Sequence, residues 1–564
     1  MVAQKRDGTT SNWRRPPGAL GSRDQSADAG GKRAQQRSSN RRWTHSMVAS
    51  ATCARALAVS GALVLLGGVL AVTLHQRLFD VILDKKLELT PSSEGYSFWH
   101  TMDVPIYMKF YFWNVTNADD VIGKKAKPIL EELGPYVYSE KHLKVNMTWN
   151  DNGTVTYMQI KTWHFEPDMS VGSRDDNITT LNVPLLAAAA LIRDLNDFMK
   201  VMFNEMVNSV DTKPFVTRTV REFLFDGYDD PLLDAASVLK YLVNISIPFD
   251  KFGWFYGRNG TNYYDGVFNM DTGRTVSQLG DLHFWNNTNT TTAFDAPCNM
   301  VNGSAGELFH PRLDKTYIEL YSTDICRSLR VPYKEPTSKY ELGGNRYQAD
   351  EMMFARPDTN PDNWCFCNGE CPPAGLLNET LCRFGVPAFV SFPHMLYADP
   401  AVIGQTVGQR PNESLHNFHI DLEPLTGVPL SVRARFQINM LLKPNSDVTI
   451  LYDVPTVYLP MLWFDNAVDT TPDIAAQFVT IVETVPTIMS ASSFALLGLG
   501  AALLVCAALL LVALRSRQPA RSGAAYQGQE FSPRGMSRTA MSSVITSARN
   551  MKPGGRPSVA HGHP

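Results

Sequence analysis

Two long apolar runs, one near each end of the chain, dominate the pattern of hydrophobic and polar positions. Residues 56–74 are 19 positions without a charged side chain, and residues 491–514 are 24. As helices these runs would be about 28 and 36 Å long, enough to cross a hydrocarbon core of about 30 Å. The first run exceeds the apolar region of a signal peptide and follows a long basic segment, which indicates an uncleaved signal anchor. The pattern predicts two membrane-spanning helices.

Shorter periodicities between these runs predict a domain that is mostly β. From Val432 to Leu442, apolar residues at even-numbered positions alternate with polar residues such as Arg433 and Gln437. This alternation is typical of a half-buried antiparallel strand, with the odd-numbered face in solvent. Segments 106–115, 154–165 and 448–463 are also predicted to be extended.

A helical period marks residues 184–210. Here Ile192, Leu195, Met199, Met202 and Met206 advance by three or four positions, which predicts one amphipathic helix. A shorter helix is predicted for residues 216–224. We expect a single domain over residues 75–490, because no linker-like break or internal repeat interrupts it. Tails 1–55 and 515–564 lack the aliphatic residues of a core and are predicted to be disordered.

The distribution of charge predicts the orientation. Residues 1–55 contain 11 Lys and Arg against 3 Asp and Glu, and residues 515–564 contain 8 against 1. The chain between them carries 33 basic and 51 acidic side chains. The positive-inside rule therefore predicts cytoplasmic tails at both termini, spans at 56–74 and 491–514, and an extracellular domain over 75–490.

Glycosylation signals point to the same orientation. Eleven Asn-X-Ser/Thr triplets without proline lie between the two runs, and neither tail contains one. Such a one-sided distribution predicts a surface exposed to the secretory lumen. The acceptor residues are Asn114, Asn146, Asn152, Asn177, Asn244, Asn259, Asn286, Asn289, Asn302, Asn378 and Asn412.

Six of the eight cysteines lie between the two runs. They are Cys298, Cys326, Cys365, Cys367, Cys371 and Cys382. In an oxidising compartment we expect disulfides among them, and spacing alone leaves 15 pairings open. A zinc site over 365–371 is the less favoured alternative, because the C-x2-C spacing of structural zinc sites is missing. No metal is expected. Cys53, beside the first run, is a candidate for palmitoylation or a plain small apolar residue.

Signatures of catalysis are missing from the sequence. We find no G-x-S-x-G, H-E-x-x-H, Walker or dinucleotide-binding pattern, so no enzyme activity and no cofactor are expected. His394 stands out, but an oriented core histidine is favoured over a catalytic one because no nucleophile is evident nearby. Small residues at Gly67 and Ala71, and at Gly498 and Ala502, have the spacing of helix dimers, so a homo-oligomer is one alternative.

Eight blocks in order resemble the class B scavenger receptor family. That family includes the fatty acid translocase, the high-density lipoprotein receptor, the lysosomal integral membrane protein and the insect sensory neuron membrane proteins. The resemblance covers nearly all of residues 56–520. Its blocks are FYFWNVT (110–116), GPYVY (134–138), FEPDMSVG (165–172), GYDDP (227–231), NMVNGS (299–304), DICRS (324–328), SFPH (391–394) and DLEPLTG (421–427).

The resemblance implies an α+β membrane protein with an antiparallel β-barrel core, a helical bundle at the apex and an internal hydrophobic tunnel. It also implies the disulfides Cys298–Cys365, Cys326–Cys382 and Cys367–Cys371. An apical ligand site would include Arg193, Lys200, Met202, Phe203, Met206 and Lys213. Residues 185–213 have a net charge of −1, so the apex departs from members that capture anionic particles on basic residues.

These observations predict a cell-surface receptor that binds lipids or lipoproteins at the apex and passes lipid to the membrane. The expected ligands are fatty acids, sterols, phospholipids or lipoproteins, and not nucleic acid. The tail has no acidic dileucine signal, and Tyr526 begins no tyrosine sorting motif, so the plasma membrane is favoured over the lysosome. Two alternatives stay open: a two-span ligand-gated channel, which the uncharged spans disfavour, and a two-pass ecto-enzyme.

Overall fold

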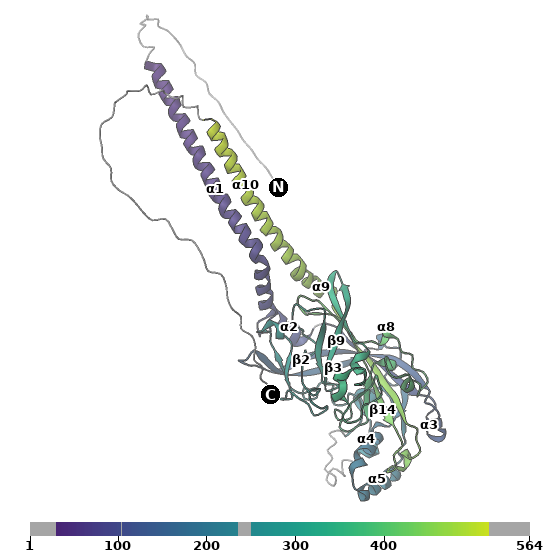
Figure 1. Ribbon diagram of the computed structural model, residues 1–564. Helices are drawn as coiled ribbons and strands as arrows, with labels where there is room; N and C mark the ends of the chain where they lie inside the picture. Colours follow the sequence, from purple (N-terminus) through teal and green to yellow (C-terminus); the bar gives the residue numbers. More distant parts are fainter. Residues whose placement is uncertain (1–29, 103, 235–249, 518–564) are drawn as a thin grey trace, which may run out of the picture. The chain divides into compact units, whose positions relative to one another are not determined.

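One long helix near each end of the chain is apolar enough to cross a membrane. The computed structural model describes residues 30–102, 104–234 and 250–517 (Figure 1). Helix α1 covers Gly30–Leu87 and helix α10 covers Val485–Ser516. The apolar stretches within Ser46–Leu87 and Pro472–Ser516 have the length and composition of membrane spans. The chain is therefore a membrane protein with a candidate span on each side of one large domain.

Two glycines let these helices approach each other closely. A Cβ atom on Gly68 would lie 2.7 Å from the Leu497 backbone nitrogen, and one on Gly500 would lie 2.5 Å from the Leu65 nitrogen. Any side chain at either position would therefore force the helices apart. Gly67 and Gly498, which the sequence nominated for dimerisation, have no such neighbour within 4 Å. The dimer stays a prediction.

The large domain is built on a 13-stranded antiparallel sheet. The strand order is β7-β6-β3-β2-β1-β15-β14-β13-β10-β9-β8, with β12 pairing β14 and β11 pairing β12. Bridges through Ser304 join Asp281, beside β7, to Leu320 of β8, so the two edges of the sheet meet. The sheet is nearly closed, as the predicted barrel requires. The strands are β1 (Ile106–Val115), β2 (Leu130–Trp149), β3 (Thr154–Phe165), β6 (Phe268–Asp271), β7 (Leu282–Trp285), β8 (Tyr317–Ser322), β9 (Arg327–Lys339), β10 (Leu342–Gln348), β11 (Leu377–Asn378), β12 (Ala388–Ser391), β13 (His419–Leu422), β14 (Pro429–Leu442) and β15 (Val457–Asp469).

Strand β14 is buried on both faces from Phe436 onward, which corrects the solvent-exposed face predicted from its alternation for that half of the strand. Gln437 and Asn439 on the supposed solvent face are both fully buried. Gln437 accepts hydrogen bonds from the Trp113 indole and from the His394 backbone, and Asn439 donates to Ser391. Covering segments thus satisfy these polar side chains, so their polarity did not signal exposure. Segments 106–115 and 154–165 match β1 and β3, whereas 448–463 begins as the turn η8 (Thr449–Leu451) and becomes a strand only at Val457.

The predicted apical helices need two corrections. The helix expected over 184–210 is broken into α4 (Val183–Leu191), the turn η2 (Ile192–Asp194) and α5 (Asp197–Ser209). The Asn196 side chain accepts a hydrogen bond from the Met199 backbone and starts α5 as an N-cap. Residues 216–224 were expected to be helical throughout, but the strand β5 (Phe215–Thr219) occupies the first part and only residues from 220 onward are helical, ending in the π-helix Glu222–Asp226. β5 pairs with β4 (Asn177–Leu181). The β-branched residues of β5 favour this extended conformation.

Smaller helices complete the domain. In Figure 1, α4 and α5 lie at the end of the ectodomain opposite α9 (Pro472–Val479). We call the end formed by α4 and α5 the apex. The remaining helices are α2 (Glu94–Thr101), α3 (Ala118–Lys124), α7 (Pro400–Ile403), α8 (Glu413–His416) and α9 (Pro472–Val479).

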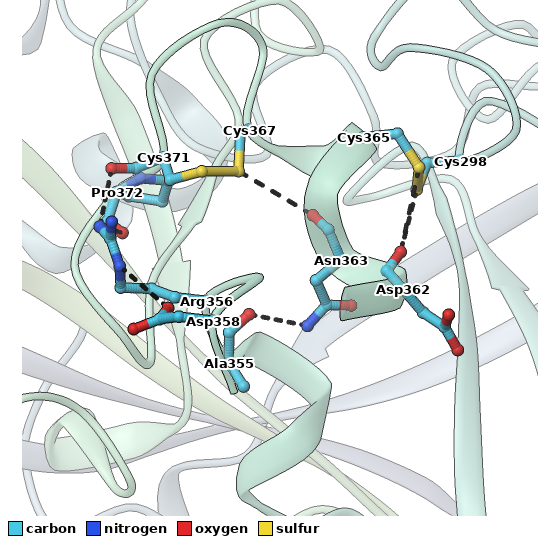
Figure 2. The surroundings of a disulfide bond; sticks show 10 residues. All are labelled: Cys298, Ala355, Arg356, Asp358, Asp362, Asn363, Cys365, Cys367, Cys371 and Pro372. Atoms are coloured by element: carbon cyan, nitrogen blue, oxygen red, sulfur yellow. Dashed lines mark hydrogen bonds and ion pairs between the residues drawn. A yellow bond between two sulfur atoms is a disulfide. The ribbon is translucent and has the colours of Figure 1, made fainter. Parts of the chain in front are cut away.

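Three disulfides crosslink the segments between β7 and β12. They join Cys298 to Cys365, Cys326 to Cys382 and Cys367 to Cys371, the pairs that the family resemblance implied. Two of them flank the turn that contains Asp362 and Asn363 (Figure 2). Cys53 and Cys506 are free and exposed, so palmitoylation of Cys53 stays a prediction.

The glycosylation acceptors are mostly exposed. Asn114 and Asn378 are half-buried, and Asn244 lies outside the described residues. An exposed acceptor can be glycosylated, but exposure does not show that it carries a glycan. Occupancy of these sites therefore stays a prediction. The exposed acceptors are Asn146, Asn152, Asn177, Asn259, Asn286, Asn289, Asn302 and Asn412.

Candidate functional site

A cavity of about 510 Å³ lies inside the nearly closed sheet. Its wall takes residues from β1, β2, β3, β8, β9, β12, β14 and β15, and α4 contributes at the apex. This volume is in the range of sites that bind drug-sized molecules, about 300–1,000 Å³. The domain therefore has an interior large enough for a small organic ligand.

The alternation of β14 and β15 supplies one side of the wall. Ala434, Phe436 and Ile438 of β14 line the cavity, since side chains two residues apart share a face. Phe464 lies opposite Phe436 in the paired strand β15 and lines the cavity with it. The even-numbered apolar positions read from the sequence are thus the ones that face the interior.

Helix α4 supplies the apical side. Pro184, Ala187, Ala188 and Leu191 line the cavity. The Asn182 side chain accepts a hydrogen bond from the Leu185 backbone and fixes the start of this helix. Small alanine side chains here leave open space, where larger ones would fill it.

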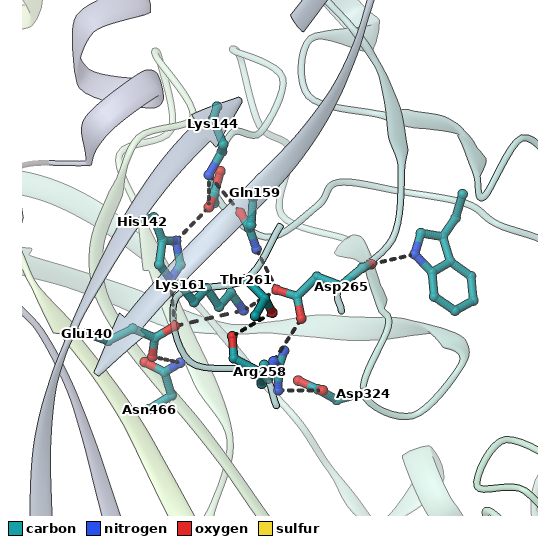
Figure 3. A network of polar contacts seen from close by, with 12 residues as sticks. Glu140, His142, Lys144, Gln159, Lys161, Arg258, Thr261, Asp265, Asp324 and Asn466 are labelled. Carbon is teal, nitrogen blue, oxygen red and sulfur yellow. Dashed lines mark hydrogen bonds and ion pairs between the residues drawn. The ribbon is translucent and has the colours of Figure 1, made fainter. Parts of the chain in front are cut away.

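Charged residues line the side of the cavity near the start of β1, and Figure 3 shows the contacts among them. Glu140 lies opposite Ile106, the first residue of β1. Lys161 lies 3.8 Å from the Glu140 carboxylate and 3.5 Å from that of Asp265. Arg258 bridges Asp265 at 2.8 Å and Asp324 at 3.1 Å. The side chains of these residues form a continuous ionic network.

The network continues away from the cavity into the domain. His142 lies 2.6 Å from Glu140 and 3.0 Å from Glu307, and Lys144 donates to Glu307 at 2.6 Å and to Gln159 at 2.9 Å. Lys144 is fully buried, beneath the Trp99 and Tyr157 rings. We use "ionic network" for these residues together: Glu140, His142, Lys144, Gln159, Lys161, Arg258, Asp265, Glu307 and Asp324.

Opposite charges stabilise the ionised carboxylates of this network. Burial alone would raise the pKa of Glu140, but His142 and Lys161 outweigh it and lower that pKa to about 2. Lys144 and His142 likewise outweigh burial and lower the pKa of Glu307 to about 2. Lys161 and Arg258 hold the pKa of Asp265 well below its usual range. These carboxylates are therefore charged at neutral pH.

The apical residues predicted to bind ligand lie apart from the cavity. None of the six borders it in the described part of the chain. Phe203 is buried and Met206 half-buried in the packing beneath α5, and Lys200 pairs with Asp447 at 3.1 Å. Arg193, Met202 and Lys213 are exposed.

An exposed apolar patch lies on α5 at the apex. Phe198, Val201 and Met202 are 70 %, 60 % and 53 % exposed. Of these residues only Met202 belongs to the predicted apical site and to the helical period of the sequence, which does not include Phe198 and Val201. Large apolar side chains gathered in solvent often mark an interaction surface.

His394 is an oriented core histidine, as the sequence favoured. Its Nδ1 accepts a hydrogen bond from the Arg410 backbone at 3.0 Å, so the ring proton is on Nε2 and is donated to Glu132 at 2.9 Å. Its ring stacks on His416 with centroids 4.0 Å apart. Both ring nitrogens are thereby used in hydrogen bonds within the protein.

The fold and the cavity together define a class: a two-span membrane protein whose disulfide-bonded β domain encloses a largely apolar chamber. The family model described as the CD36 family matches residues 58–511, and the chain belongs to this family.

Curated relatives agree with this assignment. Scavenger receptor class B member 1 of Mus musculus is 32 % identical over 456 residues, covering 80 % of this chain and 87 % of that protein. Protein peste of Drosophila melanogaster is 34 % identical over 415 residues, covering 72 % and 73 %. Lysosome membrane protein 2 of Homo sapiens is 32 % identical over 433 residues, covering 75 % and 88 %. The chain is thus similar to scavenger receptors and to a lysosomal membrane protein.

Proposed function

We propose that this protein is a cell-surface lipid receptor that captures lipid at its apex and passes single lipid molecules through the cavity toward the bilayer. In this proposal, residues 75–490 are extracellular and tails 1–55 and 515–564 are cytoplasmic. The observation that carries it is the 510 Å³ cavity, walled mainly by apolar side chains, in a domain held between two candidate membrane spans.

The physical advantage of such a cavity is large. Moving a sixteen-carbon chain through water exposes its methylenes at a free-energy cost of about 13 kcal/mol, or about 0.8 kcal/mol each. A covered apolar chamber removes most of this barrier without a chemical reaction. Transfer by this route needs neither a catalytic group nor a nucleotide, which agrees with the missing sequence signatures.

The apex supports the capture step. The patch of Phe198, Val201 and Met202 presents apolar surface to solvent, which favours contact with a lipid particle. The α4 residues line the cavity, so in this proposal captured lipid enters beside α4.

In this proposal, the part of the ionic network that lines the cavity lies at its membrane-proximal end. Glu140 is paired with the first residue of β1, and β15 ends at the same side before leading into α9 and α10. On the proposed route a passing lipid would therefore meet these paired charges before the bilayer. Transfer accordingly requires this side to open, and the rate of opening would limit flux.

Two matched variants test the proposal. Ala187→Trp adds bulk to a residue that lines the cavity, and Ala190→Trp adds the same bulk to a half-buried residue of the same helix that does not. In cells with little endogenous receptor, uptake of a fluorescent fatty acid should rise above mock for the native chain and for Ala190→Trp. Uptake with Ala187→Trp should stay near mock at equal surface expression. Equal uptake by all three would overturn a route through the cavity.

A further inference from the structure

Two arginines of the ectodomain are equally buried but differ in their partners. Arg258 and Arg327 are each 5 % exposed. Arg258 pairs with the carboxylates of Asp265 and Asp324. The Arg327 Nε donates to the Ser328 backbone oxygen at 3.2 Å, and among the described residues its two Nη atoms have no hydrogen-bond or ion-pair partner. A buried charge without a partner is strongly unfavourable, so Arg327 needs a source of negative charge.

The guanidinium of Arg327 borders a small cavity of about 20 Å³, which shares no lining residue with the large one. Its central carbon lies 3.5 Å from the centroid of the Phe366 ring and 5.8 Å from that of Phe354, and both rings line the small cavity. The unpartnered Nη atoms keep some accessible surface, unlike enclosed atoms such as the Trp254 indole nitrogen. The free N–H groups of Arg327 therefore reach the small cavity.

The small cavity has a positive lining. Among the described residues it is bordered by two arginines and by no Asp or Glu. The second arginine, Arg356, donates to the backbone oxygens of Cys371 and Pro372 at 3.3 and 3.1 Å (Figure 2). Its carboxylate partner, Asp358, lies 3.5 Å away and is largely exposed. Like charges around a concave site attract an ion of the opposite sign, here an anion.

Glu379 is the carboxyl group that could neutralise Arg327 from within the protein. It does not line the small cavity, and no ion pair within 4 Å involves it in the described structure. Burial lowers the pKa of Arg327 to about 9, and Glu379 offsets part of that shift. Burial also raises the pKa of Glu379 to about 8. At neutral pH the guanidinium is therefore charged while the carboxyl group is mostly protonated.

We propose that the small cavity binds one chloride ion on the Nη atoms of Arg327, with Arg356 adding to the positive potential. A cavity needs about 10–15 Å³ to hold one water molecule, so about 20 Å³ admits a single particle little larger than water. Chloride has this size and supplies the missing charge. Sulfate, phosphate and carboxylate groups are too large, and water has no charge. The inference does not depend on lipid entering the large cavity.

The bound ion would join separate segments of the ectodomain. Arg327 begins β9, whereas Phe354 ends the turn η5 (Glu351–Phe354) and Phe366 ends the turn η6 (Pro361–Phe366). The lining continues through the Cys367–Cys371 disulfide to β11. Chloride would thus hold residues 351–377 against the barrel, and its removal should loosen this segment first.

Thermal unfolding in two salts tests the site. Full-length protein in phosphatidylcholine nanodiscs would be unfolded in sodium chloride and in sodium gluconate at the same ionic strength, because gluconate is too large for the small cavity. Chloride at about 150 mM should raise the melting temperature of the native chain by about 2 °C, since an ion that binds only the native state stabilises it.

Two matched variants assign that rise to the site. Arg327→Gln should lose the difference between the two salts. Arg330→Gln removes an exposed arginine of the same strand and should keep it. No difference in the native chain, or an undiminished difference in Arg327→Gln, would overturn the inference.

Hydrogen exchange of the native chain keeps the test decisive if Arg327→Gln does not fold. Backbone amides within residues 351–377 should exchange about threefold more slowly in chloride than in gluconate, while those of α5 should not change. Equal exchange in the two salts, or protection spread evenly over the domain, would contradict a chloride ion at Arg327. Neither measurement involves lipid, so failure of the proposed function would leave both results unchanged.

Discussion

The two sides of the ectodomain interior are built on opposite principles. On the side formed by α4, β12 and β14, apolar side chains surround open space and need no particular partner. On the side formed by β2, β3 and Arg258, nearly every charged group has a specific partner within 4 Å. Apolar packing tolerates small changes, whereas removing one member of a buried ion pair leaves a charge uncompensated. The apolar side can therefore tolerate small changes of side-chain shape, while the ionic side behaves as a fixed framework.

The largest loss of stability should follow the removal of Lys144 from the ionic side. Lys144→Met should destabilise the domain by about 3–5 kcal/mol, because Glu307 would remain buried without its closest cation. Thermal unfolding of the purified protein and its surface level in cells would measure the loss. Lys141→Met, on the exposed face of the same strand, is the matched control.

A double variant identifies the cause of that loss. Lys144→Met with Glu307→Gln removes both charges and should recover part of the lost stability. If the loss of unfolding free energy in the double variant equals the sum of the losses in the two single variants, Lys144 and Glu307 are not energetically coupled.

The next largest effect should come from the disulfide that joins the segments of Asp324 and Glu379. Cys326→Ser should cost about 2–5 kcal/mol and retain the protein inside the cell. Cys367→Ser should have a smaller effect, because its bond spans a sequence separation of 4 rather than 56. Normal surface levels of Cys326→Ser would contradict this ranking.

Stability should depend on pH in opposite directions for the two kinds of carboxyl group. Glu140 and Glu307 have lowered pKa values of about 2, so their stabilisation is present above their ordinary pKa of 4.5 and is lost as pH falls toward 2. Glu379 has a raised pKa of about 8, so the native state holds a proton that the unfolded chain releases above pH 4.5. Stability should therefore fall as pH rises from about 4.5 to 8.

The Glu379→Gln variant isolates the second of these effects. Its melting temperature should be higher than that of the native chain at pH 8, and its profile between pH 5 and 8 should be flatter. The slope removed is at most about 1.4 kcal/mol per pH unit. An identical slope in both proteins would show that Glu379 is ionised in the native state.

The smallest effect is expected on the apolar side. Ile438→Val shortens a half-buried side chain of the cavity wall and should cost about 1 kcal/mol or less. Lipid uptake should be unchanged. A loss comparable to that of Lys144→Met would show that the apolar wall is as tightly specified as the ionic network, and would remove the contrast.

Local patterns predicted the parts of this molecule that depend on local chemistry. The two spans follow from uninterrupted apolar runs, and the inward positions of β14, such as Phe436, follow from strict alternation. Burial of Gln437 and Asn439 could not be predicted, because it depends on covering segments distant in sequence. The break at Asn196 had a local signal, because asparagine is a common N-cap residue. The regular apolar spacing across it nevertheless favoured one continuous helix.

The candidate site was predictable to a lesser degree. The resemblance implied an apical ligand site and a tunnel; the six apical residues do not line the cavity, and their role in binding stays a prediction. The ionic network draws Glu140, Arg258 and Glu307 from three distant segments. No spacing in the sequence relates such residues, because only the closure of the sheet brings them together.

Photocrosslinking tests the central claim, that lipid occupies the cavity, most directly. Full-length protein in nanodiscs would be irradiated with an alkyl-diazirine lipid, and the modified residues located by mass spectrometry. Adducts are expected on cavity residues such as Phe436 and Trp254, and they should be lost in Ala187→Trp and retained in Ala190→Trp. Adducts confined to α1, α10 and the exposed face of α5 would contradict it.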